Sequence, residues 1–279
     1  MELKTTIYTS ERKTGFIAEI KSMFQDLISS SELAKRLFIR DKKAEYRQSI
    51  LGILWAFITP LINAAVWIFL SMSGAIKIET DQLPYPLFVF IGSMLWSIFS
   101  ESINSPLIST TNAKSLISKI NFPKEAILLS GFYKVIFNTV IKLVIIGFAL
   151  VAFKIIPGLE IIFGLGMILF LILFGFAIGL LITPIGMLYK DIGRGIPLAL
   201  SFLMYTTPVV YQEMKNPFIS QLIGINPLTP IINSTRNLLS GYGWDQPLYL
   251  LIIFIVSLIV FIIGWIFYRI SIPIIVERM

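Results

Sequence analysis

The feature that most constrains the fold of this chain is a series of six apolar runs, five of them long. An α-helix needs about 20 mostly apolar residues to cross roughly 30 Å of hydrocarbon. Hydrophobic residues make up 56% of the 279 residues and charged residues only 14%, whereas soluble domains carry about 25% charged residues. We therefore predict an all-α integral membrane protein of six transmembrane helices, at about 50–74, 86–110, 127–153, 161–189, 195–212 and 247–268.

The distribution of Lys and Arg predicts the orientation of these helices. Ten of these residues precede the first run, and seven more lie in the second-to-third loop, the fourth-to-fifth turn and the segment that follows the last run. The opposite side has only Lys77, Lys154, Lys215 and Arg236. Because positive loops stay on the cytoplasmic side, we expect a multi-pass protein of the cytoplasmic membrane with both termini in the cytoplasm.

The chain divides into a cytoplasmic N-terminal segment, residues 1–49, and a transmembrane domain, residues 50–279. Within the first, residues 26–49 are predicted to form an amphipathic helix at the membrane interface. Its apolar face is Leu33, Ala34, Leu37 and Phe38. Its basic stripe, at helical spacing, is Arg36, Arg40, Lys43 and Arg47. Two interpretations of the stripe remain open: an anchor to anionic lipid, and a site that binds an anionic substrate.

Residues 213–245 are too polar and too rich in proline for a span. Two apolar pieces within them, 218–225 and 231–239, are each too short to cross a membrane. We predict short re-entrant helices in the outer leaflet, with protein covering their ends; an amphipathic external loop is the alternative. The fifth run is also short, and Pro208 is expected to break it near the outer face.

Polar residues recur on one face of three of the predicted spans, where they are costly in lipid and often face water or a bundle interior. Together these faces predict a hydrated conduit, in which deep aromatic rings would stack on sugars. Hydrogen bonding between packed helices is the alternative for each residue taken singly. The predicted conduit residues are Thr59, Asn63 and Trp67 in the first run, Ser93, Trp96, Ser97, Phe99, Ser100 and Asn104 in the second, and Ser201 and Tyr205 in the fifth.

Three charged residues fall within the predicted spans: Glu101, Lys134 and Lys142. Counting about 1.5 Å per residue from the cytoplasmic ends of the helices places Glu101 and Lys134 at a similar depth. We therefore predict an intramembrane ion pair between them. Lys142 lies deeper, and either extends toward the outer interface or meets an anionic substrate.

Several kinds of chemistry are excluded by missing residues. The sequence has no Cys and no His, which removes thiolate nucleophiles, imidazole bases and Cys/His metal sites. It also has no G-x-x-x-x-G-K-[ST] motif for nucleotide phosphates. The net charge of +7 is accounted for by topology, so we expect no nucleic-acid partner. No catalytic or metal site is predicted.

Four segments of the chain carry a family resemblance: RDKKAEYRQSILGILWAFITPL, residues 40–61, and the shorter Asn121-Phe-Pro-Lys124, Tyr189-Lys-Asp-Ile192 and Asn226-Pro-Leu-Thr-Pro230. In this order they resemble the membrane permeases of ABC exporters for lipid-linked polysaccharides such as O-antigen and teichoic acid. Residues 40–61 are similar to that family's basic surface helix followed by the start of its first span, and Lys190 replaces the family's Arg.

The resemblance implies a homodimer of this chain bound to two copies of an ABC ATPase subunit. ATP and Mg would then be held by the ATPase, and this chain would carry no cofactor and catalyse no reaction. The implied cargo is a polyprenyl-diphosphate-linked glycan, which the basic stripe would meet from the cytoplasm. The implied ATPase contact is Asn121, Phe122, Pro123 and Lys124.

Three further functions remain open at this point. A permease for drugs or other lipids would have the same helices but less need for the basic stripe. The second is a membrane-embedded polyprenyl-sugar transferase, and the third is a stand-alone carrier. The absence of His disfavours the transferase, and the absence of an internal repeat disfavours the carrier.

Overall fold

The computed structural model describes residues 16–47, 51–74, 82–120, 122–212, 221 and 223–277, and within them the chain is helical, with no strand. The predicted all-α class is thus confirmed for this part of the chain. The helices are α1 (Phe16–Ser29), α2 (Ser31–Arg47), the 3-10 turn η1 (Gly52–Leu54), α3 (Trp55–Met72), α4 (Tyr85–Asn112), α5 (Lys114–Ile117), α6 (Glu125–Ala152), α7 (Glu160–Leu188), α8 (Lys190–Tyr205), α10 (Leu228–Leu239) and α11 (Pro247–Glu277).

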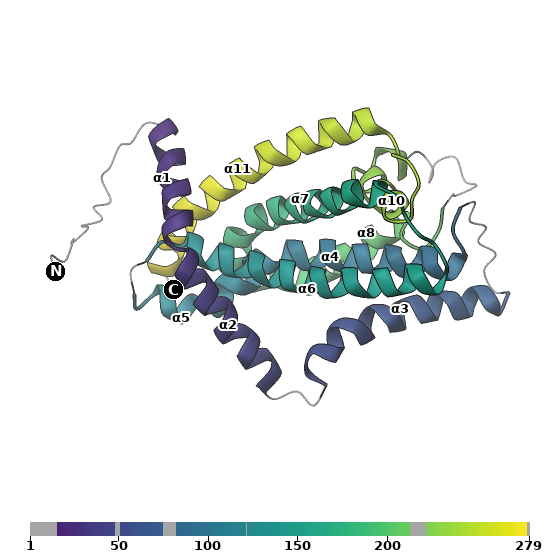
Figure 1. Ribbon diagram of the computed structural model, residues 1–279. Helices are drawn as coiled ribbons and strands as arrows, with labels where there is room; N and C mark the ends of the chain where they lie inside the picture. Colours follow the sequence, from purple (N-terminus) through teal and green to yellow (C-terminus); the bar gives the residue numbers. More distant parts are fainter. Residues whose placement is uncertain are drawn as a thin grey trace.

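Four of the described helices are long and apolar enough to cross a membrane: α4, α6, α7 and α11. They coincide with the second, third, fourth and sixth predicted spans. The first predicted span contains α3, of 18 residues, and the fifth overlaps α8, of 16, which begins five residues before it. These two helices also run along the long axis of the bundle, and each is antiparallel to the long helix that follows it in the chain (Figure 1). Six spans therefore remain a prediction, of which four have helices of sufficient length.

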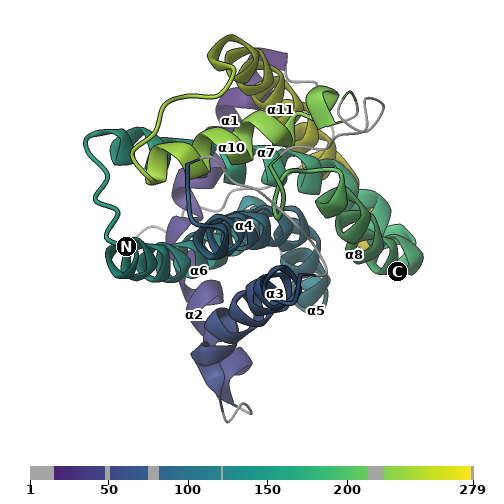
Figure 2. The same cartoon turned by 90° about the vertical axis from the view of Figure 1, so that its right-hand side faces the viewer.

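Helix α4 forms the centre of the bundle, with α6, α7 and α3 around it (Figure 2). Small residues allow α7 to approach it closely. A Cβ on Gly179 would lie 2.4 Å from the carbonyl oxygen of Ile103, and one on Gly175 would lie 3.1 Å from that of Phe99. This packing by small residues is typical of membrane helices, which gain little from the hydrophobic effect in lipid.

Helices α1 and α2 cross one end of the bundle, which we call the basic end (Figure 1). Helix α2 confirms most of the predicted helix over 26–49, but the structure places a break at Ser30 and adds α1, which the sequence did not predict. The apolar face of α2 packs against α6, where Ala34 and Leu37 are buried and the Phe38 ring meets Tyr133 edge-on. This face therefore contacts protein, where the sequence suggested lipid headgroups.

Ion pairs attach α1 to the last helix. Arg269 of α11 donates to Asp26 of α1 at 2.6 Å and to Glu125, at the start of α6, at 2.5 Å. The Phe24 ring also meets Trp265 edge-on, with 5.4 Å between centroids. The basic end is thus closed by contacts between the first and last described helices.

The opposite end, which we call the α10 end, contains the short helix α10 packed against α7 and α4. Arg236 of α10 is 1% exposed. It donates to the main-chain oxygens of Pro208 and Val209 at 2.8 and 3.0 Å, and its guanidinium lies 3.7 Å from the centre of the Phe88 ring. Helix α8 ends at Tyr205, before Pro208, so these carbonyls belong to unwound chain and Arg236 satisfies them.

The predicted re-entrant pair is only partly described. Helix α10 covers the second of the two apolar pieces and is largely buried by protein. Residues 213–220 and 222, in and around the first piece, lie outside the described residues. A re-entrant arrangement therefore stays a prediction.

Candidate functional site

A cavity of about 830 Å³ lies at the basic end, between α2, α4, α6 and α8. Helices α2, α4 and α6 present charged side chains, amides and hydroxyls to it, and α8 contributes one proline. The lining residues are Arg40, Asp41, Lys42, Ala44 and Glu45 of α2, Glu101, Asn104, Ser105, Ile108, Ser109 and Asn112 of α4, Lys134 and Asn138 of α6, and Pro197 of α8. Such a lining suits a ligand that carries both charge and hydroxyl groups.

The α4 wall of this cavity continues a polar face along the helix. Ser97, Ser100, Glu101 and Asn104 are all partly exposed and lie at helical spacing on one side of α4. We call these four residues the α4 polar face. Three of them were predicted to line the conduit, and the structure gives them an accessible position.

Three other predicted conduit residues of α4 point elsewhere. Phe99 is 0% exposed and stacks on Phe174 of α7, and Trp96, 8% exposed, packs beside Phe99. Ser93 is also buried. The prediction that these three line a conduit is therefore wrong for the single chain. The reason is that α4 is enclosed on most of its circumference, so only one narrow face remains accessible.

Helix α6 supplies a ladder of polar side chains at i, i+4 and i+8: Lys134, Asn138 and Lys142. Lys142 donates to Glu101 at 2.9 Å, and the Asn138 amide donates to the other oxygen of Glu101. Lys42 of α2 donates to the Asn138 carbonyl oxygen at 2.9 Å. Asn138 thus joins the Glu101–Lys142 pair on α4 and α6 to helix α2.

The predicted ion pair of Glu101 with Lys134 is therefore wrong, because Glu101 pairs with Lys142, two helical turns farther along α6. Lys134 instead donates to Asp41 of α2 at 2.5 Å. The depth estimate failed because it counted from assumed span ends and omitted α2, whose acidic residue sits level with Lys134.

Asp41 is held by two cations from two helices. Its Oδ1 accepts from Nε and Nη2 of Arg40 at 2.9 and 2.7 Å, and its Oδ2 accepts from Lys134. Burial favours the protonated acid, but the hydrogen bonds and charges of Lys134 and Arg40 outweigh it. The net effect lowers the pKa of Asp41 below its ordinary value, so Asp41 is a carboxylate at neutral pH.

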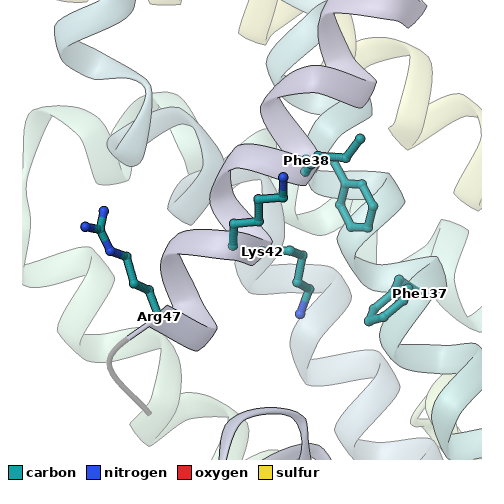
Figure 3. A pocket seen from close by; sticks show the side chains of 6 residues that line it. Phe38, Lys42, Arg47 and Phe137 are labelled. Carbon is teal, nitrogen blue, oxygen red and sulfur yellow. The ribbon is translucent and has the colours of Figure 1, made fainter.

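The basic stripe is exposed along its whole length. Of its four members, Arg40 lines the larger cavity, while Lys43 and Arg47 line a second one of about 570 Å³ with Phe38, Ile39, Lys42 and Phe137. Figure 3 shows Arg47 and Phe137 on opposite sides of the end of α2. Arg36 lines neither and pairs with Glu32 at 3.1 Å. Lys42, which was not among the predicted site residues, contributes to both cavities.

The predicted conduit residues on α3 and α8 lie apart from the larger cavity. The Trp67 ring meets that of Tyr205 edge-on at 6.4 Å, which brings α3 and α8 together. Thr59 and Ser201 are exposed, and each hydroxyl bonds to a carbonyl one turn back in its own helix. The side chain of Asn63 lies outside the described residues.

The predicted ATPase contact lies at the basic end, between α5 and α6. Phe122, Pro123 and Lys124 are half-buried, and Lys124 lies 4.8 Å from the centre of the Phe122 ring. Burial lowers the pKa of Lys124, with the Glu125 charge opposing the shift. Asn121 lies outside the described residues.

Several known proteins are similar to this chain in sequence. Two O-antigen export system permease proteins RfbA of Klebsiella pneumoniae are 26% and 27% identical to it over 228 residues, which cover 81% of this chain and 86% of each relative. The RfbA of Myxococcus xanthus is 23% identical over 216 residues, covering 76% and 82%. Residues 32–240, which include every residue that lines the larger cavity, match the ABC-2 type transporter family. The chain therefore belongs to the ABC-2 type transporter membrane family.

Proposed function

We propose that this chain is the transmembrane subunit of an ATP-driven exporter that moves polyprenyl-diphosphate-linked polysaccharide, such as O-antigen or teichoic acid, across the cytoplasmic membrane. The family and the names of its relatives support a transport permease. The observation that carries the choice of cargo is the cavity, because an exposed basic stripe there adjoins a polar face on an otherwise buried helix. The basic stripe suits a diphosphate, and the polar face suits a glycan.

In this proposal the basic end faces the cytoplasm, and the chain works as a homodimer with two ATPase subunits. The ATPase supplies ATP and Mg, and this chain performs no catalysis. The exposed helix faces then become the conduit walls. They are the α4 polar face without Glu101, together with Thr59, Asn63 and Trp67 of α3 and Ser201 and Tyr205 of α8.

The diphosphate is expected to meet Arg36, Arg40, Lys43 and Arg47, since Arg and Lys make charge-assisted hydrogen bonds to phosphate oxygens. The ATPase is expected to dock on Asn121, Phe122, Pro123 and Lys124. Phe122→Asp should therefore weaken co-purification with the ATPase and lower coupled ATP hydrolysis. Unchanged association and turnover would place the ATPase contact elsewhere.

The direct test is transport by the permease and its ATPase, purified together and reconstituted in liposomes. We expect ATP-dependent movement of a polyprenyl-diphosphate glycan, and none of a labelled phospholipid or an apolar cationic drug. Movement of the phospholipid or drug in place of the glycan would show that the chain is instead a permease for drugs or other lipids.

A further inference from the structure

We infer that Asp41 is a resident counterion in an anion site formed by Arg40 and Lys134, and that a diphosphate binds by displacing it. The identity of the diphosphate rests on the proposed function; the anion site itself rests on geometry. Asp41 joins the two cations across a helix interface, with its side chain 17% exposed and that of Lys134 15% exposed. Both line the larger cavity, so a ligand reaches them without a change of fold.

The arrangement around Asp41 matches what a phosphate group requires. Arg40 presents two N–H donors to one oxygen, and Lys134 presents an ammonium to the other. Fork-shaped donation from Arg together with a Lys point charge is a common way to bind phosphate. One carboxylate balances only one of the two positive charges, which leaves a net charge of +1 for an incoming anion to use.

Nearby acidic groups favour exchange of Asp41 for the incoming anion over binding of the anion beside Asp41. Glu45 and Glu101 also line the cavity, and each is held by another lysine: Glu45 by Lys42 at 3.1 Å and Glu101 by Lys142. With Asp41 in place, a further anion meets three carboxylates. A diphosphate carries enough charge to satisfy both Arg40 and Lys134 once Asp41 withdraws, whereas a single negative charge gains little over Asp41 itself.

Displacement would also loosen α2. The Asp41–Lys134 pair attaches the second half of α2 to α6, whereas the first half is attached by Ala34 and Leu37. Removal of the ion pair leaves this half of α2 held by neutral contacts and Lys42, including the Phe38–Phe137 ring contact, the Lys42–Asn138 bond and the Lys42 ammonium over the Phe137 ring. Anion binding and the position of α2 are thereby coupled, so the cargo itself would open the cavity beside this helix.

The test measures binding of inorganic pyrophosphate to the full-length permease in nanodiscs of a zwitterionic lipid. Asp41→Asn should tighten binding by about tenfold, because the bound competitor reduces the competent fraction of molecules. Glu32→Gln is the matched control: it removes the same charge from the same helix, at a side chain 70% exposed and remote from the cavity. Equal tightening by both variants would reduce the effect to net charge and overturn the inference.

Lys134→Met supplies a second arm, in which Asp41 keeps its pair with Arg40 and the fold is expected to persist. Pyrophosphate binding should fall by at least tenfold, and Lys134→Arg should retain it. Wild-type affinity in Lys134→Met would overturn the inference. In nanodiscs that contain phosphatidylglycerol, pyrophosphate should still bind; its complete exclusion would assign the site to a lipid headgroup.

The outcomes separate this inference from the proposed function. If the permease transports glycan but its affinity for pyrophosphate is unchanged by substitution of Asp41 or Lys134, only the inference is overturned. The expected binding pattern in a permease that transports no glycan would overturn the proposed function and keep the anion site.

Discussion

At the basic end, helices are joined by ion pairs between residues far apart in the sequence, whereas at the α10 end the buried Arg236 bonds to main-chain carbonyls. The basic end has Arg269 with two carboxylates, Lys134 with Asp41, and Lys142 with Glu101. Among the described residues no carboxylate pairs with Arg236. A charged ligand can replace one partner of an ion pair, but it cannot easily replace a main-chain carbonyl. The basic end is therefore suited to respond to cargo, and the α10 end to remain closed until the helices themselves move.

The largest expected effect is at the α10 end. Arg236→Met would leave the carbonyls of Pro208 and Val209 without their donor, and each unpaired buried group costs about 1–3 kcal/mol. We expect a loss of about 3 kcal/mol or more in the free energy of unfolding, measured by denaturant titration in detergent. A loss below about 1 kcal/mol would mean that water or neighbouring chain reaches these carbonyls, and the contrast between the ends would fail.

Gly92 tests the same end by packing. A Cβ there would lie 2.2 Å from the oxygen of Val209 and 2.6 Å from Nη2 of Arg236. Gly92→Ala should therefore cost about 1–3 kcal/mol by overpacking. Gly147→Ala, also within a long helix but with open space at its Cβ, is the control and should be neutral or slightly stabilising. Equal effects of the two substitutions would contradict the close packing around Arg236.

The basic end is tested by a double-mutant cycle. Glu101→Gln and Lys142→Met should show a coupling of about 1–2 kcal/mol, because Glu101→Gln alone leaves the buried ammonium of Lys142 without its carboxylate. The same cycle with Glu101 and Lys134 should be additive to within about 0.5 kcal/mol. The reverse result would restore the pairing that the sequence suggested.

The smallest effects on stability are expected from the basic stripe, where Arg→Ala should change the free energy of unfolding by no more than about 0.5 kcal/mol. Its effects on glycan export should instead rank with position: largest for Arg40, intermediate for Arg47 and smallest for Arg36. Export measured in the reconstituted system checks this order. If Arg40→Lys and Arg47→Lys both export at the wild-type rate, the stripe is only a lipid anchor.

Much of the fold could be predicted because length and hydropathy act locally. Four long spans, the helix at α2 and the spacing of its basic stripe follow from patterns within about 30 residues. Helix α1 was missed because its sequence is short and its partners on α11, Trp265 and Arg269, lie more than 200 positions away. From the sequence, Arg236 contributes only to the charge distribution, because its role depends on contacts with Pro208 and Val209.

The site was predictable only in outline. A period of 3.6 residues identifies the accessible face of α4, but it cannot tell how many sides of the helix are covered, so Trp96 and Phe99 were misplaced. It also cannot tell which of two lysines on α6 meets Glu101. That choice depends on the relative heights of three helices, which no local pattern encodes.

The contact of Arg269 with Asp26 has a consequence for how the protein is made. The two residues are 243 positions apart, and at about 5–20 residues per second a ribosome takes roughly 12–50 seconds to travel between them. During that time α1 exists without its ion-pair partner on α11. We therefore expect a protease to cleave α1 more readily before α11 is synthesised and packed against it than afterwards.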